Sequence, residues 1–153
     1  MYQLNLPSVS LKYRTENSKQ LVFDVIRKKY VVLTPEEWVR QNFIHYLINH
    51  LKYPPGLIAV EAVVKINSLN QRADIVVYNR KGKPVMIVEC KAPKIKVDNK
   101  VFEQAARYNL SLGVDYLLVT NGLKHYCAQL VPKNKSYTML KAVPAFNEID
   151  RVE

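Results

Sequence analysis

Residues 72–94, RADIVVYNRKGKPVMIVECKAPK, form the stretch that decides the fold. Two runs rich in β-branched residues flank a polar segment that contains a glycine, and this pattern predicts a β-hairpin. We expect a two-residue turn at positions 81–82, and a hairpin closed there pairs Asp74 with Glu89. Both strands are apolar on both faces over most of their length, so we expect other elements to cover them on both sides.

Side chains alternate along a strand, so Asp74, Glu89 and Lys91 are expected to share one face at the open end of the hairpin. The opposite face is expected to hold Ala73, Ile75, Val77, Met86, Val88 and Cys90, which makes Cys90 a core residue. Two carboxylates directly opposite each other repel unless something lies between them. Mg²⁺ is the natural candidate, because it takes oxygen ligands and often uses only one or two carboxylates.

Lys91 lies beside this expected cation, where an ammonium group can orient a water molecule or stabilise charge on a phosphate. The residues therefore indicate hydrolysis of a phosphodiester. A structural interpretation of the same residues stays open. In that interpretation Glu89 and Lys91 form a solvated pair where the strand leaves the core, and Asp74 pairs with Arg72.

The segments on either side of the hairpin are expected to form helices and strands. Thr34 and Pro35 predict the start of a helix that runs to about residue 51. A second helix is expected from about residue 99 to residue 112, capped by Asp98 and stopped by Gly113. Further strands are expected at 57–66, 115–120 and 125–131, with a strand or hairpin within 20–33 and a short edge strand within 137–143.

The second helix carries an apolar stripe at helical spacing, formed by Val101, Ala105, Tyr108 and Leu112. Gln104 and Tyr108 are i and i+4 and are therefore neighbours on the helix surface. Beside an acidic site, an amide and a phenol are suited to hold a phosphate backbone or to position a base. The alternative is that Tyr108 is a core residue with its hydroxyl at the rim, and that Gln104 borders it.

The predicted fold class is α/β, with a mixed β-sheet flanked by helices in the order α-β-β-β-α-β-β after an N-terminal strand or hairpin. The segment 92–114 is long enough to cross over and return parallel to the strand before it. At 153 residues, the chain is expected to form a single domain, with residues 1–20 as an extension and the core at roughly 23–131.

Composition narrows the expected partners and location. Lys and Arg number 23 and Asp and Glu 13, and nucleic acid is the commonest partner for such a net charge of +10. No apolar run is long enough to cross a bilayer, and the N-terminus has no secretory pattern, so no membrane partner is expected. Cys90 and Cys127 make neither a disulfide framework nor a zinc spacing, and a reducing cytoplasm fits them.

The spacing Asp74-x14-Glu89-x-Lys91 on a hairpin, followed by Gln104-x3-Tyr108 on the next helix, resembles the PD-(D/E)XK nuclease superfamily. More closely, the strings TPEEWVRQ, RADIVVYNRKGKPVMIVECKAPK, EQAARY and VTNG resemble the N-terminal nuclease domain of type I restriction enzyme restriction (R) subunits. The resemblance covers roughly residues 23–131 and implies a restriction-endonuclease-like core.

By position, the resemblance implies that Asp74 and Glu89 ligate Mg²⁺, or Mn²⁺ in its place, with the carbonyl of Cys90 as a possible further ligand. Lys91 is the implied catalytic lysine. Glu37, in E-x-x-R-Q, matches an acid that some members bring to the metal site, and a capping box with Thr34 is the alternative explanation for it. Contacts to nucleic acid are expected at Gln104, Tyr108, Lys94, Lys100 and Arg107.

The function that follows is a metal-dependent endonuclease that hydrolyses DNA, with DNA, methylase and specificity subunits or a separate motor as partners. Two departures from the pattern matter. Ala73 replaces the proline that names the superfamily, and no GxxxxGK[ST] phosphate loop is present, so the chain is not expected to translocate DNA by itself. The alternatives are a non-cleaving DNA-binding module or accessory subunit with the same fold, and a nuclease that acts on RNA or on single-stranded ends.

Overall fold

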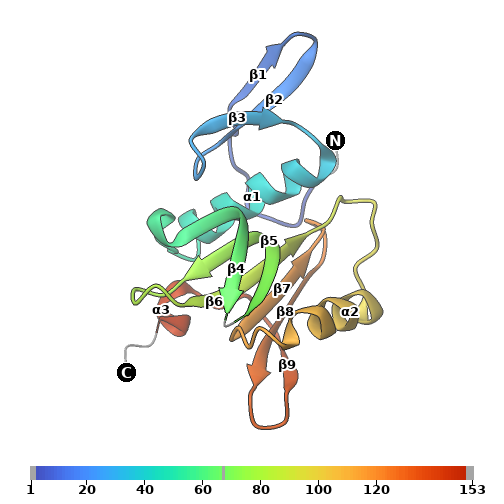
Figure 1. Ribbon diagram of the computed structural model, residues 1–153. Coiled ribbons are helices and arrows are strands. Elements are labelled where there is room, and N and C mark those ends of the chain that lie inside the picture. The colour runs from blue at the N-terminus through green and yellow to red at the C-terminus, as the bar shows by residue number, and fades with distance from the viewer. Residues whose placement is uncertain (1–2, 67, 151–153) are drawn as a thin grey trace.

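The computed structural model describes residues 3–66 and 68–150 and contains two β-sheets (Figure 1). A three-stranded antiparallel sheet is formed by β1 (Tyr13–Glu16), β2 (Lys19–Asp24) and β3 (Lys29–Val32). A six-stranded sheet is formed, in chain order, by β4 (Ile58–Ile66), β5 (Leu69–Tyr78), β6 (Pro84–Cys90), β7 (Tyr116–Thr120), β8 (His125–Val131) and β9 (Ser136–Leu140). The helices are α1 (Pro35–Asn49), α2 (Asn99–Leu110), α3 (Phe146–Ile149) and the short 3-10 helix η1 (Pro55–Leu57).

The six-stranded sheet is mixed, because β6 and β7 run parallel while its other neighbours run antiparallel. The connection between β6 and β7 contains α2, so the chain crosses over and returns as the segment 92–114 predicted. The predicted mixed sheet with flanking helices is confirmed.

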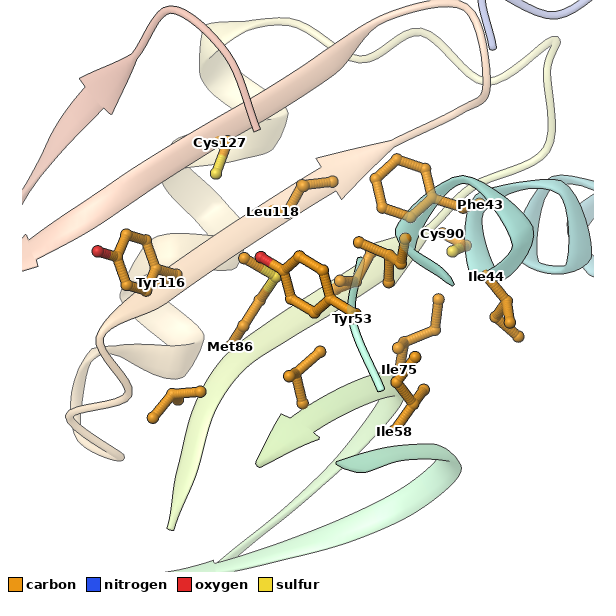
Figure 2. Close-up of a cluster of buried hydrophobic side chains, with 14 of the residues drawn as sticks. Phe43, Ile44, Tyr53, Ile58, Ile75, Met86, Cys90, Tyr116, Leu118 and Cys127 are labelled. Atoms are coloured by element: carbon orange, nitrogen blue, oxygen red, sulfur yellow. The ribbon is translucent and has the colours of Figure 1, made fainter. Parts of the chain in front are cut away.

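Each face of the large sheet carries its own apolar cluster. On one face, α1 and α3 pack on side chains that include Ile75, Met86 and Leu118 (Figure 2). On the other face, α2 packs on side chains that include Val76 and Ile87. Both strands of the hairpin are therefore covered on two sides, as their apolar composition predicted.

The start of α1 follows its predicted capping signal in part. The Thr34 hydroxyl accepts a hydrogen bond from the Glu37 N–H at 3.0 Å, and Pro35 occupies the first turn. In a capping box the Glu37 carboxylate would also accept the Thr34 backbone N–H. Here this carboxylate accepts hydrogen bonds from Arg40 and Gln41 instead. The prediction of a capping box at Glu37 is therefore wrong.

The buried face of α2 differs from the predicted stripe. Asp98 caps this helix by accepting the Val101 N–H at 3.0 Å, as expected. The side chains that enter the core are Phe102, Ala105 and Asn109, whereas Tyr108 is 66% exposed. The interpretation of Tyr108 as a core residue is therefore wrong, because Asn109 takes the inward position.

The turn of the central hairpin is longer than predicted. Asn79 closes it with hydrogen bonds to the backbone on both sides, and Gly82 adopts a left-handed conformation with φ of 81°. This is a three-residue turn rather than the predicted two-residue turn. An irregularity between Val77 and Tyr78 absorbs the extra residue, so Ile75 still pairs with Val88 as predicted.

Near the site, the side chains of β4 and β5 switch from one face of the sheet to the other. Ile75 packs on the α1 side of the sheet, but Ala73 packs on the α2 side, so the prediction that these two residues share a face is wrong. The pairing of β4 with β5 skips Glu61 and Asp74, and Glu61 has a φ of 49°. This left-handed residue turns the strand pair, and Asp74 lies at the point where the faces exchange.

No helix in the described ranges is long and apolar enough to span a bilayer.

Candidate functional site

The open end of the hairpin brings Asp74 against the end of β6. The Asp74 Oδ2 atom accepts the Cys90 N–H at 2.7 Å, and its Oδ1 atom lies 3.1 Å from Nη2 of Arg40 on α1. Lys91 continues the parallel ladder, because its N–H donates to the Thr120 carbonyl at 2.8 Å. The backbone therefore places Asp74, Glu89 and Lys91 at one end of the sheet.

Glu89 is held from the other side of the sheet. Nδ2 of Asn109, on α2, donates to Oε1 of Glu89 at 3.1 Å and to the Ala105 carbonyl at 2.8 Å. The Asn109 side chain is almost fully buried, whereas Glu89 is half-buried at the end of β6. Asn109 thereby orients the Glu89 carboxylate toward the surface of α2.

A cleft of about 620 Å³ lies between the end of β6 and the exposed side of α2. Its lining consists of Glu89, Lys91, Val101, Gln104, Ala105, Arg107 and Tyr108. Gln104 and Tyr108 therefore meet Glu89 and Lys91 in one cleft. Lys94 and Lys100 are exposed side chains that do not line it.

Asp74 and Glu89 take their partners from opposite sides of the sheet, which differs from the predicted shared face. Asp74 bonds to α1 and does not line the cleft, whereas Glu89 bonds to α2. Within residues 3–66 and 68–150, no three His, Cys, Asp or Glu side chains converge as metal ligands. The two carboxylates that the sequence analysis assigned to Mg²⁺ therefore do not line one cleft in this structure.

Glu36, which was not predicted from the sequence, lies close enough to the site for the charges there to affect its pKa. Partial burial raises the pKa of Glu36, and the negative charge of Asp74 raises it further. The positive charges of Arg40 and Lys91 oppose this rise in pKa. Nη2 of Arg40 lies 3.4 Å from the Glu36 carboxylate and 3.1 Å from the Asp74 carboxylate, so this guanidinium compensates their repulsion.

Glu37 belongs to an ion-pair network beneath the site. Its carboxylate lies 2.6 Å from Nη1 of Arg40 and 3.2 Å from Nη2 of Arg27, and it is almost fully buried. Arg40 also pairs with Asp74, so Glu37 reaches Asp74 through this guanidinium. In this structure Glu37 acts on the site through Arg40.

Cys90 packs in the core next to α1 (Figure 2), and complete burial raises the pKa of its thiol well above the ordinary value. Its side chain is therefore an inert packing group. The carbonyl of the same residue is the atom that the sequence analysis assigned to the metal.

Besides Glu36, two residues of the site, Arg40 and Asn109, were missed from sequence. Arg40 follows Glu37 at i+3 on α1, and that spacing is the signal that could have revealed a pair. Asn109 carries no such signal, because an amide in a helix ordinarily indicates an exposed position.

The fold and the cleft define a mixed α/β domain with a charged cleft at one end of its sheet. Residues 35–144 match a family model described as the type I restriction enzyme R protein N terminus, and the chain belongs to this family. No curated protein matches the chain.

Among solved structures, the chain is similar to a fragment described as an HsdR subunit of a type I restriction enzyme from Vibrio vulnificus YJ016. The identity is 23% and the TM-score is 0.40, over 60% of this chain and 19% of that chain. The present chain therefore spans about a fifth of that structure's length.

Proposed function

We propose that this chain is a metal-dependent nuclease domain that hydrolyses phosphodiester bonds in DNA. Membership of the R protein N-terminal family supports a role in restriction. The observation that carries the proposal is the cleft, because it gathers a carboxylate, an amine, an amide, a guanidinium and a phenol at the end of β6. These groups are suited to a phosphate and to the charge that develops on it during hydrolysis.

Asp74 and Glu89 would hold a divalent cation, Mg²⁺ or Mn²⁺, with the Cys90 carbonyl as a further ligand. When bound, such a cation supplies Lewis acidity and lowers the pKa of a coordinated water. Asp74 is already fixed by the Cys90 N–H, and Glu89 by Asn109, so each carboxylate is oriented by a neighbour. Carboxylates that are already oriented in this way need to move less when a cation binds.

Lys91 would act on the reacting phosphate. Among the described residues, no carboxylate lies within ion-pair distance of its ammonium group, and its backbone is fixed by β7. The ammonium is therefore available to orient a water or to stabilise negative charge on a phosphate oxygen.

Gln104, Arg107 and Tyr108 would bind the DNA backbone along the wall of the cleft. All three side chains are exposed on one side of α2, and Arg107 offers the donor geometry that matches phosphate oxygens. Lys94 and Lys100 lie outside the cleft, where they would contact flanking phosphates. Partners that supply methylation, specificity or a motor would complete a restriction system.

The direct test is cation binding and plasmid nicking by Asp74→Asn and Glu89→Gln, with Glu103→Gln as the control. Glu103 is an exposed carboxylate on α2 outside the cleft, so it matches the charge change. We expect calorimetry to show weakened Mg²⁺ and Mn²⁺ binding in the first two variants, and nicking to fall by about 100-fold or more. Binding and nicking equal to those of Glu103→Gln would refute the assignment.

A second function is favoured by one observation. The Arg40 guanidinium already neutralises part of the Asp74 charge, as in a domain that keeps the fold without cutting. A non-cleaving DNA-binding module would show salt-dependent DNA binding with no nicking in either Mg²⁺ or Mn²⁺. RNA and single-stranded DNA, offered in the same assay, separate these substrates from duplex DNA.

A further inference from the structure

The three-stranded sheet has one buried face and one outward face. Val22 and Asp24 on β2 are fully buried, so the face that they share lies against the body of the protein. The neighbouring positions Leu21 and Phe23 alternate to the other face, as the period of a strand requires. Tyr30 pairs with Phe23 across β2 and β3, so its ring lies on the same outward face.

Two cationic side chains lie on the aromatic rings of this outward face. Phe23 and Tyr30 meet edge to face with their centroids 5.2 Å apart. The Lys12 ammonium lies 5.7 Å from the Phe23 centroid, and the Arg14 guanidinium lies 4.1 Å from the Tyr30 centroid. We name these four residues, Lys12, Arg14, Phe23 and Tyr30, the basic-aromatic face.

The rings of the basic-aromatic face are not part of the two hydrophobic clusters that pack on the large sheet. Val25 and Ile26, just beyond β2, pack against the cluster under α1, but the two described clusters include neither Phe23 nor Tyr30. What the rings contact instead is the pair of cations. A cation held on a ring keeps a fixed position at the surface, and an arginine held flat presents its N–H edge outward.

This arrangement suits phosphate better than bases. Lys12 lies over the Phe23 ring and Arg14 over the Tyr30 ring, so a base that stacks on the same side would have to displace them. Phosphate oxygens, in contrast, match the outward N–H groups of arginine. Glu16 lies 3.2 Å from Arg14, but both side chains are about half exposed, so that pair is weak.

The sheet that carries the basic-aromatic face is fastened to α1 and β4. Arg27, in the turn between β2 and β3, pairs with Glu37 on α1 at 3.2 Å and with Glu61 on β4 at 3.3 Å. Glu37 in turn pairs with Arg40, which reaches Asp74. Figure 1 shows the sheet above α1, at the opposite end of the molecule from the β8–β9 hairpin.

We propose that the basic-aromatic face binds phosphates of duplex DNA outside the segment that occupies the cleft, as a second anchor that does not depend on sequence. This inference rests on the proposed function for its substrate class. A chain with a net charge of +10 supplies the electrostatic attraction that such an anchor needs.

The test measures duplex binding over a range of salt for Lys12→Gln/Arg14→Gln and for Lys133→Gln/Lys135→Asn. The control pair removes two exposed charges from the turn between β8 and β9. Each phosphate contact contributes about 0.9 to the slope of log affinity against log salt, so we expect the slope to fall by about 1.8 in the first variant only. Lys12→Arg/Arg14→Lys, which keeps both charges, is expected to retain most of the slope.

The outcomes separate this inference from the proposed function. If the parent nicks plasmid but the Lys12/Arg14 variant matches the control slope, the anchor is refuted and hydrolysis stands. If the slope falls as expected but the parent cuts nothing in Mg²⁺ or Mn²⁺, the anchor stands and hydrolysis is refuted. If the parent binds single-stranded DNA more tightly than duplex, and Tyr30→Leu loses this preference, base stacking is supported and the phosphate anchor is refuted.

Discussion

Asp24 shows how a carboxylate stays ionised inside this chain. It is fully buried, and its oxygens accept the N–H groups of Ile26 and Arg27 at 2.8 and 2.9 Å and the Nε–H of Arg27 at 2.7 Å. Burial pushes the pKa of Asp24 upward, but the hydrogen bonds from Arg27, Gln41 and Ile26 together outweigh it, so the pKa lies below its ordinary value of 3.8. The ionised group therefore stabilises the link between β2 and the following turn.

Replacing Asp24 with Asn is expected to destabilise the protein at neutral pH by roughly 1.5–3 kcal/mol, because hydrogen bonds to a charged group are lost. A carboxyl whose pKa is lowered on folding gives its full stabilisation above the ordinary value of 3.8, and loses it as the pH falls from there through the lower pKa of the folded state. The difference in unfolding free energy between parent and variant should therefore stay constant near neutral pH and shrink as the pH falls below about 4. Urea denaturation measures it, with Glu103→Gln as the control, and a difference that stays constant with pH would contradict the account.

At the residue scale, sequence predicted which side chains lie near the end of the hairpin, but it did not predict what they contact. The spacing of Asp74, Glu89 and Lys91 placed them at one end of the sheet. Beside Glu61 the side chains switch faces of the sheet, and Asp74 contacts Arg40. The left-handed backbone conformation of Glu61 could not be predicted from its residue type. Backbone conformation, rather than residue type, decided this contact.

At the scale of elements, α1 and β5 are joined by one buried guanidinium. Arg40 is 4% exposed and lies within 3.4 Å of carboxylates from Glu36, Glu37, Glu61 and Asp74. Burial of these charges is costly, and only their mutual pairing offsets it. Removal of Arg40 would leave Glu37 with less compensation inside the protein.

Arg40→Met is therefore expected to lower the free energy of unfolding by roughly 3–5 kcal/mol, the range for breaking a buried ion pair. Arg72→Met is the matched control, since Arg72 pairs with Glu61 from a largely exposed position, where such pairs contribute less than about 1 kcal/mol. Urea denaturation of both variants gives the comparison. Equal losses in the two variants would show that the network under α1 is not a structural link.

Helices with strong capping signals were predictable from the sequence, but which face of α2 packs on the sheet was not. Asp98 and Thr34 both cap helices as predicted, because capping depends on neighbours in the chain. The rotation of α2 was misjudged because Asn109, a polar residue, takes an inward position that only its bonds to Glu89 and Ala105 explain. In the hairpin, the turn length was wrong by one residue, and the irregularity at Val77 restored the register.

At the scale of the whole molecule, two surfaces are the ones that we propose bind DNA. One is the cleft between β6 and α2, and the other is the basic-aromatic face of the small sheet. The network through Arg27, Glu37 and Arg40 links the sheet that bears the second surface to Asp74 on β5. A duplex that touches both surfaces would be held at two places while the cleft acts on it.

The rate of plasmid nicking in Mg²⁺ by Lys91→Met, compared with that of Lys133→Met, tests most directly whether the cleft hydrolyses DNA. Both changes remove one ammonium group, but Lys91 lines the cleft whereas Lys133 lies in the turn between β8 and β9. We expect a loss of about 100-fold or more for Lys91→Met, which is typical when a charge-stabilising donor is removed, and little change for Lys133→Met. Equal rates for the two variants would contradict this expectation.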